Sequence, residues 1–264
     1  MNKKRIRFPL TFLAAAIPTF AQSTWNNTST GDPDWGNVEN WSSGAVPGAT
    51  TDVVIGSTPS GGIIGLNDGG NAITIKSLTV NSGVGAFSFV PLAGESLAVN
   101  GSINNNDSES LDFQVAVNAG ANATWSGPLN FSNNVVIGTR LVTLSGSQSF
   151  IGSNLNFDIT SATTYGRFVV SGTTSFISTV KINIGGSYFG TLGNSFDFTT
   201  GNFTNATLGS LPTLNAGLEW NTSEFLSSGI LTVVSAVPEP STYATLLGLG
   251  VIGLAVYRRS RPSV

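Results

Sequence analysis

The sequence of 264 residues contains no cysteine and no histidine. Without cysteine, the chain can form no disulfide bond, iron–sulfur site or thiolate nucleophile. Without histidine, it can form neither a Ser-His-Asp triad nor a histidine-ligated zinc centre. These absences exclude most hydrolase mechanisms. We therefore expect no catalytic residue, no metal site and no cofactor.

Charged residues are also scarce, at 9% of the chain. Most of the basic ones lie near the two ends, and residues 22–236 keep only four of them, which are Lys76, Arg140, Arg167 and Lys181. The same part holds 13 acidic residues, so its net charge is 4 minus 13, or −9. Nucleic acids and anionic membrane surfaces are bound by basic faces. We expect the chain to have no nucleic-acid partner.

The first 21 residues have the features of a secretory signal peptide. Four basic residues between Lys3 and Arg7 precede an apolar run at 8–20, and the small residue Ala21 follows. This order predicts a signal peptide over 1–21 that is cut after Ala21. The alternative is an N-terminal membrane anchor, which is disfavoured because the run is short and contains two prolines.

The C-terminal part, 237–264, combines an extended motif with an apolar segment. Pro238 and Pro240 flank Glu239, and because proline restricts φ and lacks an N–H group, a helix can begin only after them. Residues 241–257 carry no charge. At about 1.5 Å per residue they form a helix of roughly 25 Å, slightly short of a bilayer core. We predict a transmembrane helix at 241–257.

Arginines follow this apolar segment at positions 258, 259 and 261. Basic residues next to a membrane span stay on the cytoplasmic side. Arg258, Arg259 and Arg261 are therefore predicted stop-transfer residues, which places residues 22–236 outside the cytoplasm.

The order of Pro-Glu-Pro, apolar helix and arginines resembles the PEP-CTERM sorting signal of Gram-negative bacteria, a tail also similar to the C-terminal domain of some ice-binding proteins. The resemblance implies recognition by an exosortase, a membrane-embedded cysteine transpeptidase-like enzyme supplied in trans. Pro238, Glu239 and Pro240 would be the processing motif, with Arg258 and Arg259 as the retention signal. The precursor would be anchored in the inner membrane and the product would reach the cell surface or medium. A plain single-pass anchor is the alternative.

The exported part opens with Trp25, Trp35 and Trp41 among small polar residues. Tryptophan is highly buried on average, and the open end of a repetitive β structure needs an atypical cap. We expect these three side chains to plug one end of a β core. The alternative is that they stack on sugar rings.

From residue 52 onward, short alternating segments are separated by Gly, Asn and Ser. Period-2 alternation predicts half-buried strands, and no window has the 3.6-residue period of an amphipathic helix. The expected strands are 52–55, 72–75, 77–80, 87–90, 96–99, 111–117, 134–137, 141–144, 155–159, 167–170, 181–184, 195–198 and 230–234. Frequent Gly and Asn corners favour an all-β, right-handed parallel β-solenoid over 22–236. A β-sandwich is the alternative.

The segments 141–150 and 155–172 resemble the passenger repeats of autotransporter-associated β-strand proteins. The run 211–223, with 229–234, resembles the terminal rung of tail-sorted surface proteins. These resemblances imply a structural or adhesive surface protein, and they supply no catalytic motif.

Carboxylates are the remaining candidates for chemistry. Asp32 and Asp34, Asp68, and the pair Asp107 and Glu109 lie in predicted turns, where oxygen donors at close spacing would suit calcium. No EF-hand or calcium-binding nonapeptide pattern is present. Solvated turn residues are the simpler interpretation.

Three further acids lie on predicted strands. Asp112, Asp158 and Asp197 alternate with apolar neighbours and could line one face of a polysaccharide hydrolase, while Lys181 or Arg167 could serve a lyase. The thin scatter of charge argues against such a cleft.

The sequence therefore predicts an exported, non-enzymatic surface or matrix protein that is sorted by an exosortase. Extracellular polysaccharide is a further candidate partner. The alternatives are a polysaccharide-active enzyme, an ice-binding protein or a calcium-dependent adhesin. Ice binding is disfavoured because the Thr pairs, such as 163–164, are adjacent and point to opposite faces of a strand.

Overall fold

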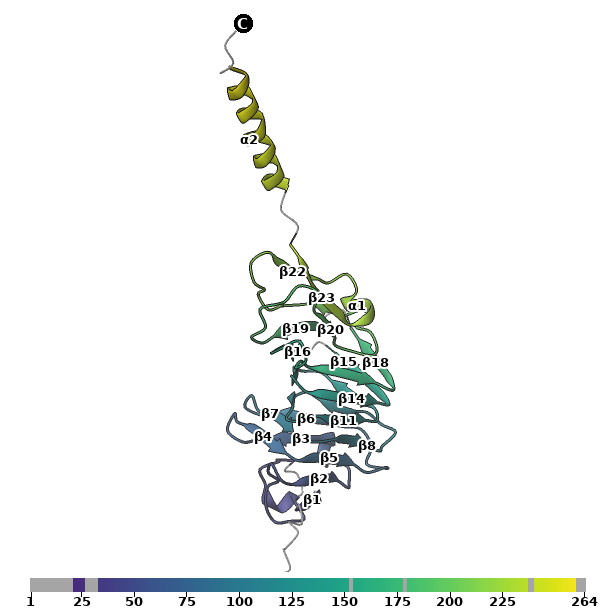
Figure 1. Cartoon of the computed structure of the whole chain (residues 1–264). Helices are drawn as coiled ribbons and strands as arrows, with labels where there is room; N and C mark the ends of the chain where they lie inside the picture. Colours follow the sequence, from purple (N-terminus) through teal and green to yellow (C-terminus); the bar gives the residue numbers. More distant parts are fainter. Residues whose placement is uncertain (1–20, 27–32, 152–153, 178–179, 237–239, 260–264) are drawn as a thin grey trace, which may run out of the picture.

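A computed structural model of the chain describes residues 21–26, 33–151, 154–177, 180–236 and 240–259. The body is an elongated stack of short strands, and the chain rises from the N-terminal end to the C-terminal end of the stack (Figure 1). Three long sheets, each parallel throughout, run along it. The predicted all-β parallel β-solenoid is confirmed, and the alternative sandwich is wrong because its neighbouring strands would be mainly antiparallel.

Each complete rung contributes one strand to each sheet. Sheet A contains β1 (Gln22–Trp25), β2 (Asp52–Ile55), β5 (Ser77–Val80), β8 (Ile103–Asn105), β11 (Ala123–Ser126), β14 (Leu141–Ser145) and β17 (Arg167–Val170). Sheet B contains β3 (Ile63–Leu66), β6 (Phe87–Pro91), β9 (Leu111–Phe113), β12 (Leu129–Phe131), β15 (Ser147–Phe150) and β18 (Thr173–Phe176). Sheet C contains β4 (Ala72–Ile75), β7 (Ser96–Val99), β10 (Ala116–Ala119), β13 (Val135–Gly138), β16 (Asn154–Asp158), β19 (Lys181–Gly185) and β21 (Thr207–Leu208).

The chain visits the sheets in the order A, B, C and then starts the next rung. Register partners in sheet A run from Val53 to Leu78, Ile103, Trp125, Leu144 and Val170 along β2, β5, β8, β11, β14 and β17. Successive rungs are therefore about 19 to 26 residues long, because corners can lengthen without disturbing the sheets. This variation is why the repeat is imprecise in the sequence.

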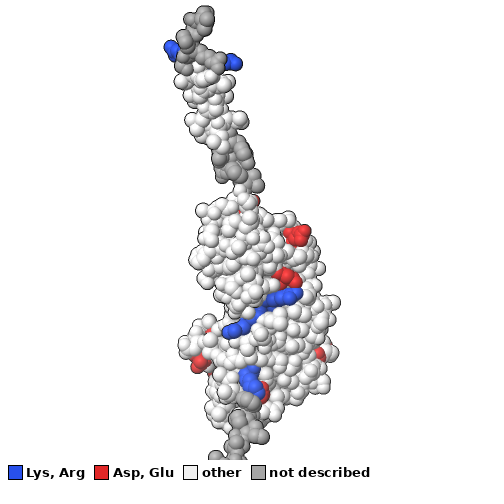
Figure 2. Space-filling view, viewed as in Figure 1, with Lys and Arg blue, Asp and Glu red and all other residues white. Residues whose placement is uncertain are grey.

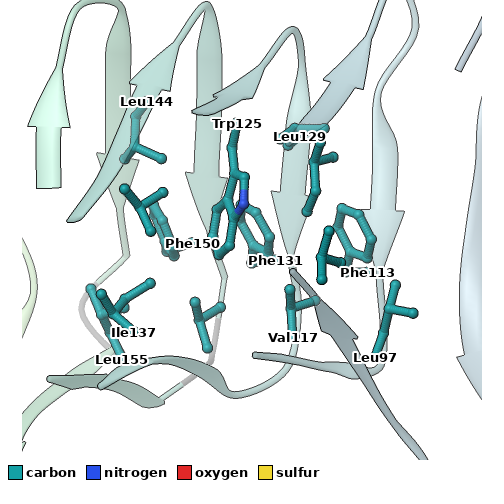
Figure 3. Packing of buried hydrophobic residues seen from close by; sticks show 14 of the residues in the cluster. Leu97, Phe113, Val117, Trp125, Leu129, Phe131, Ile137, Leu144, Phe150 and Leu155 are labelled. Atoms are coloured by element: carbon teal, nitrogen blue, oxygen red, sulfur yellow. The ribbon is translucent and has the colours of Figure 1, made fainter. Parts of the chain in front are cut away.

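The alternation of the strands determines what lies inside. In β2, Val53 and Ile55 are buried while Asp52 and Val54 are partly exposed, and most strands repeat this pattern. In parallel strands a residue keeps its face from rung to rung, so inward side chains form columns. Figure 3 shows such side chains from the middle rungs meeting between the sheets.

The clearest column is a ladder of phenylalanines inside sheet B. Phe89, Phe113, Phe131, Phe150 and Phe176 are register partners or near neighbours on successive rungs, and their rings stack with centroids 5.0 to 5.6 Å apart. Each ring packs against the rings above and below it, which adds to the stabilisation from burial alone. The ladder joins the rungs into one continuous core.

The tryptophan-rich segment caps the N-terminal end. Trp25, Trp35 and Trp41 are 0 to 3% exposed, and the ring of Trp41 lies edge-on to the other two at 5.0 and 4.6 Å. The short 3₁₀ helix η1 (Val38–Asn40) shapes this cap. The predicted plug is confirmed. Sugar stacking on these three rings is wrong, because they present no free face.

A different sheet closes the C-terminal end. Strand β23 (Ile230–Ser235) pairs antiparallel with β20 (Ser195–Asp197) on one side and β22 (Leu218–Asn221) on the other, beside the short helix α1 (Phe225–Ser228). The predicted terminal rung is therefore not a rung of the solenoid. The antiparallel sheet covers the end of the core, where Phe196, Phe198 and Phe225 are buried.

Two remaining helices complete the chain: the short 3₁₀ helix η2 (Ser60–Gly62) and the tail helix α2 (Pro240–Arg259). Helix α2 confirms the helix predicted for the tail. Among the described residues, no helix has the length and apolar character needed to cross a membrane. The predicted membrane span at 241–257 thus has no support from this helix, whose uncharged segment is slightly shorter than a bilayer core.

Candidate functional site

The sorting tail follows the last strand of the body directly. Pro240 is the first residue of α2, and Arg258 and Arg259 form its last turn. Cations at a helix C-terminus interact favourably with the helix dipole, so the arginines also stabilise the end of α2. Pro238 and Glu239, like Arg261, lie outside the described residues.

The apolar side chains of α2 are largely exposed. Leu246, Leu247, Val251 and Ile252 are 61 to 71% exposed. A helix that is apolar over most of its surface has no polar face to present to water.

At the other end, the predicted cleavage site adjoins the first strand. Ala21 is exposed, and its carbonyl oxygen accepts a hydrogen bond from the Asp52 N–H group at 3.0 Å. Gln22 is the first residue of β1 and pairs with Asp52. Cleavage after Ala21 would leave β1 whole at the new N-terminus. The signal peptide itself lies outside the described residues.

The three strand-borne acids do not share a face. Asp112 is on β9 of sheet B, Asp158 is on β16 of sheet C, and Asp197 is on β20 of the terminal sheet. Asp197 forms an ion pair with Arg167, and the Asp112 carboxylate accepts a hydrogen bond from Ser132 Oγ at 2.8 Å. The hypothesis that these acids line one catalytic face is wrong. The period-2 alternation correctly predicts that each acid points out of the core, but the three strands belong to different sheets.

The candidate lyase cations are separated in the same way. Lys181 is exposed at the start of β19 in sheet C. Arg167 begins β17 in sheet A. The two alternative candidates thus lie on different sheets of the solenoid.

The carboxylate of Asp107 is occupied by backbone groups. Asp107 is 6% exposed, and its oxygens accept hydrogen bonds from the N–H groups of Val84 and Glu109 at 2.7 and 2.9 Å, and from Gly85 at 3.3 Å. These bonds, that from Glu109 above all, lower the pKa of Asp107 against the opposing effect of burial. Asp107 therefore joins the turns of two successive rungs.

The other candidate calcium ligands are dispersed or engaged. The Asp34 carboxylate accepts hydrogen bonds from Gly36 N–H and from Asn67 Nδ2. Across the described ranges, no three acidic side chains gather as a metal site would require. Asp32 lies outside the described residues.

Sequence reasoning missed Glu95, the other buried acid. Its side chain is 3% exposed and accepts four backbone hydrogen bonds, from Leu92 and Ala93 in its own turn and from Asp68 and Gly70 in the rung before. The Ala93 bond contributes most to lowering the pKa of Glu95 from 4.5 to about 2, against burial. The signal available in the sequence was that this glutamate stands between a Gly-containing turn and an alternating strand.

Charge on the outer faces is sparse. Figure 2 shows a largely uncharged face on which basic side chains lie in small groups beside acidic ones. The described part of the chain contains two ion pairs, Lys76 with Asp52 at 2.7 Å and Arg167 with Asp197 at 2.5 Å.

The outer face of sheet A instead carries rows of small polar side chains. One row follows the register through Thr24, Val54, Thr79, Asn104, Ser126 and Ser145. Beside it, Thr124 pairs with Thr143. Rungs in a parallel sheet are about 4.8 Å apart, so these groups are closely and regularly spaced.

Comparison with known proteins identifies the tail. Residues 236–260 match a family model described as the PEP-CTERM protein-sorting motif. No curated protein and no solved structure matches the chain significantly. The resemblance of the body to autotransporter-associated repeats therefore stays a prediction. The chain carries a PEP-CTERM sorting motif, which implies a secreted protein that is anchored in the membrane until an exosortase processes it and sorts it to the cell surface.

Proposed function

We propose that this chain is a structural or adhesive protein of the surface or extracellular matrix of a Gram-negative bacterium and has no enzymatic activity. The observation that carries the proposal is the sorting motif at 236–260 joined to a β-solenoid body. The motif delivers the body to the outside, and the body offers long, regular faces there.

The construction of the body supports a structural role. Its interior is filled by apolar side chains from all three sheets, and both ends of the core are covered. Its acids are distributed over several faces or bonded to backbone groups. A repetitive rod of this kind presents extended surfaces to a partner, as other solenoid proteins do.

Processing of the tail is tested by replacing Pro238, Glu239 and Pro240 together with Ala. An enzyme that reads an extended backbone needs the shape that proline supplies, whereas partition into lipid depends on apolar surface. In a host with an exosortase, intact-mass measurement should show the variant with its tail retained and the wild type without it. A matched control replaces Ser260, Pro262 and Ser263 with Ala and should be processed normally. If wild type and the Pro-Glu-Pro variant both retain the tail, the tail is only an anchor.

Ice binding is a second candidate function, favoured by the polar rows on sheet A. Ser and Thr hydroxyls at a regular spacing on a flat face could hold an ordered layer of water. Val54 and Asn104 interrupt the row, so the array is less uniform than a pure threonine ladder. Purified protein that arrests ice growth below the melting point would favour this function over adhesion.

A further inference from the structure

One corner of the solenoid is built differently from the others. The described corners from sheet C to sheet A use residue 76, then 100–102, 120–122 and 139–140, so one to three residues suffice. Between β16 and β17 the same corner takes residues 159–166. The fold does not need these additional residues to turn.

The long corner is ordered by its own hydrogen bonds and by the core. Ile159 and Tyr165 form an antiparallel bridge, and Thr164 N–H bonds to Ser161 Oγ at 3.0 Å. The Tyr165 ring lies edge-on to Phe196 at 5.2 Å. Gly166 lets the chain approach the previous rung, because a Cβ atom there would lie 2.1 Å from the Gly138 carbonyl oxygen. This corner is a fixed wall.

A pocket of about 310 Å³ lies against this wall and is lined by Asn122, Thr139, Leu141, Thr163, Thr164, Tyr165 and Arg167. A second hollow of about 420 Å³ shares Asn122 and Leu141 with it and continues over sheet A along Ser102, Thr124 and Thr143. The two together form an open groove lined mainly by hydroxyl and amide groups. An extended, hydroxylated chain fits such a groove better than a compact ligand.

One basic side chain, that of Arg167, lines the groove. Arg167 lines the pocket, and Arg140 lies between two lining residues and accepts a backbone hydrogen bond from Arg167 at 2.9 Å. These are two of the four basic residues in a body of net charge −9. A local cation on an acidic surface selects for an anionic group at that point.

The Arg167 guanidinium is only partly engaged by protein groups. Its Nη2 atom contacts Asp197 at 2.5 Å, while Nε is buried and has no hydrogen-bond partner among the described residues, so a ligand meets the outer Nη groups. A guanidinium has five N–H donors and holds carboxylates in paired hydrogen bonds. The side chain is 33% exposed, so an incoming carboxylate can reach it.

We propose that this pocket binds a carboxylate-bearing sugar, such as a uronic acid unit of an extracellular polysaccharide, with neighbouring sugar units along the groove on sheet A. The inference rests on the proposed adhesive function and names its binding surface. Arg167 holds the carboxylate, Tyr165 and the threonines border the sugar ring, and Ser102, Thr124 and Thr143 bind hydroxyl groups of the next units.

The test measures binding of the full-length protein in detergent to oligogalacturonate, with uncharged dextran oligosaccharide as the comparison ligand. Loss of a charge-assisted contact should lower affinity about tenfold or more in Arg167→Gln. Lys181→Gln makes the same change of charge on sheet C and should stay within about twofold. Asp197→Asn removes the competing carboxylate and should bind oligogalacturonate more tightly than wild type.

The possible outcomes distinguish failure of the proposed binding pocket from failure of the proposed adhesive function. If wild type binds the oligosaccharides but Arg167→Gln and Asp197→Asn bind as wild type does, the pocket is refuted and the adhesive function remains. If wild type binds no polysaccharide, including matrix material from its own host, both fail. Melting curves from circular dichroism identify an unfolded Arg167→Gln, in which case the direction of the Asp197→Asn change decides.

Discussion

The buried carboxylate of Glu95 gives the most direct test of how the rungs are held together. Glu95→Gln keeps the size of the side chain but removes its charge and one acceptor oxygen. In the wild type, Oε1 accepts from Asp68 and Gly70 at 3.3 and 3.1 Å, and Oε2 accepts from Leu92 and Ala93 at 3.0 and 2.7 Å. In the variant, an amide NH2 group replaces one carboxylate oxygen. Its N–H donors then point at the backbone N–H donors that this oxygen bound.

The magnitude follows from those four bonds. A hydrogen bond to a charged group contributes about 1.5 to 3 kcal/mol, and bonds that share one carboxylate are not additive. We expect Glu95→Gln to lower the free energy of unfolding by about 3 kcal/mol. For a body of this size that corresponds to a fall in Tm of about 6 to 12 °C.

The effect depends on pH in a defined direction. Because the folded-state pKa of Glu95 is lowered from 4.5 to about 2, its contribution is present above pH 4.5 and is lost as the pH falls toward 2. The difference in Tm between wild type and Glu95→Gln should therefore be full at pH 7 and shrink between pH 4.5 and 2.

The assay is thermal unfolding followed by far-ultraviolet circular dichroism at several pH values. Glu219→Gln is the matched control, because Glu219 is exposed on β22 and its loss should change Tm little. The reasoning is refuted if Glu95→Gln and Glu219→Gln melt together at pH 7. It is also refuted if the Glu95→Gln difference persists undiminished at pH 2.

Two further predictions concern the core and the topology. Phe131→Ala opens a gap in the middle of the phenylalanine ladder and should lower the free energy of unfolding by about 3 to 5 kcal/mol, measured by urea denaturation. Phe189→Ala is the control, because Phe189 is 63% exposed. Similar losses in the two variants would contradict the ladder's role. Alkaline phosphatase fused after residue 236 should be active, since the body is placed outside the cytoplasm; an inactive fusion that is stably produced would contradict this placement.

The sequence predicts many of the strands whose inward positions are apolar, but not β3 or β12. Segments such as 52–55 and 96–99 alternate clearly, and both are strands with the expected faces buried. Strands β15 and β18 are not predicted from the sequence, because each has one inward phenylalanine and is otherwise polar. In β15 the other inward residue is Gln148, whose Nε2 bonds to the carbonyl oxygens of Gly127 and Ser145. Such satisfaction of a buried amide depends on neighbouring rungs and leaves no local pattern.

The corners were harder to predict than the strands. The segment 111–117 reads as one strand but bends after Phe113 into β9 and β10, so its acid faces a different side from those of later strands. Corner positions depend on which rung lies beneath, and a single sequence does not show that. For the same reason, the sequence identifies the sorting tail by local order, whereas the groove beside Arg167 combines residues from four rungs.

The antiparallel sheet at the C-terminal end has a mechanical consequence. The tail continues directly from β23, the central strand of that sheet, which is bonded to β20 on one side and β22 on the other. When the tail is held in place and the body is pulled away from it, tension enters through β23. A central strand drawn along its own axis must break hydrogen bonds to both neighbours together, instead of peeling from one edge. The antiparallel sheet that closes the solenoid therefore also bears the force that is applied through the tail.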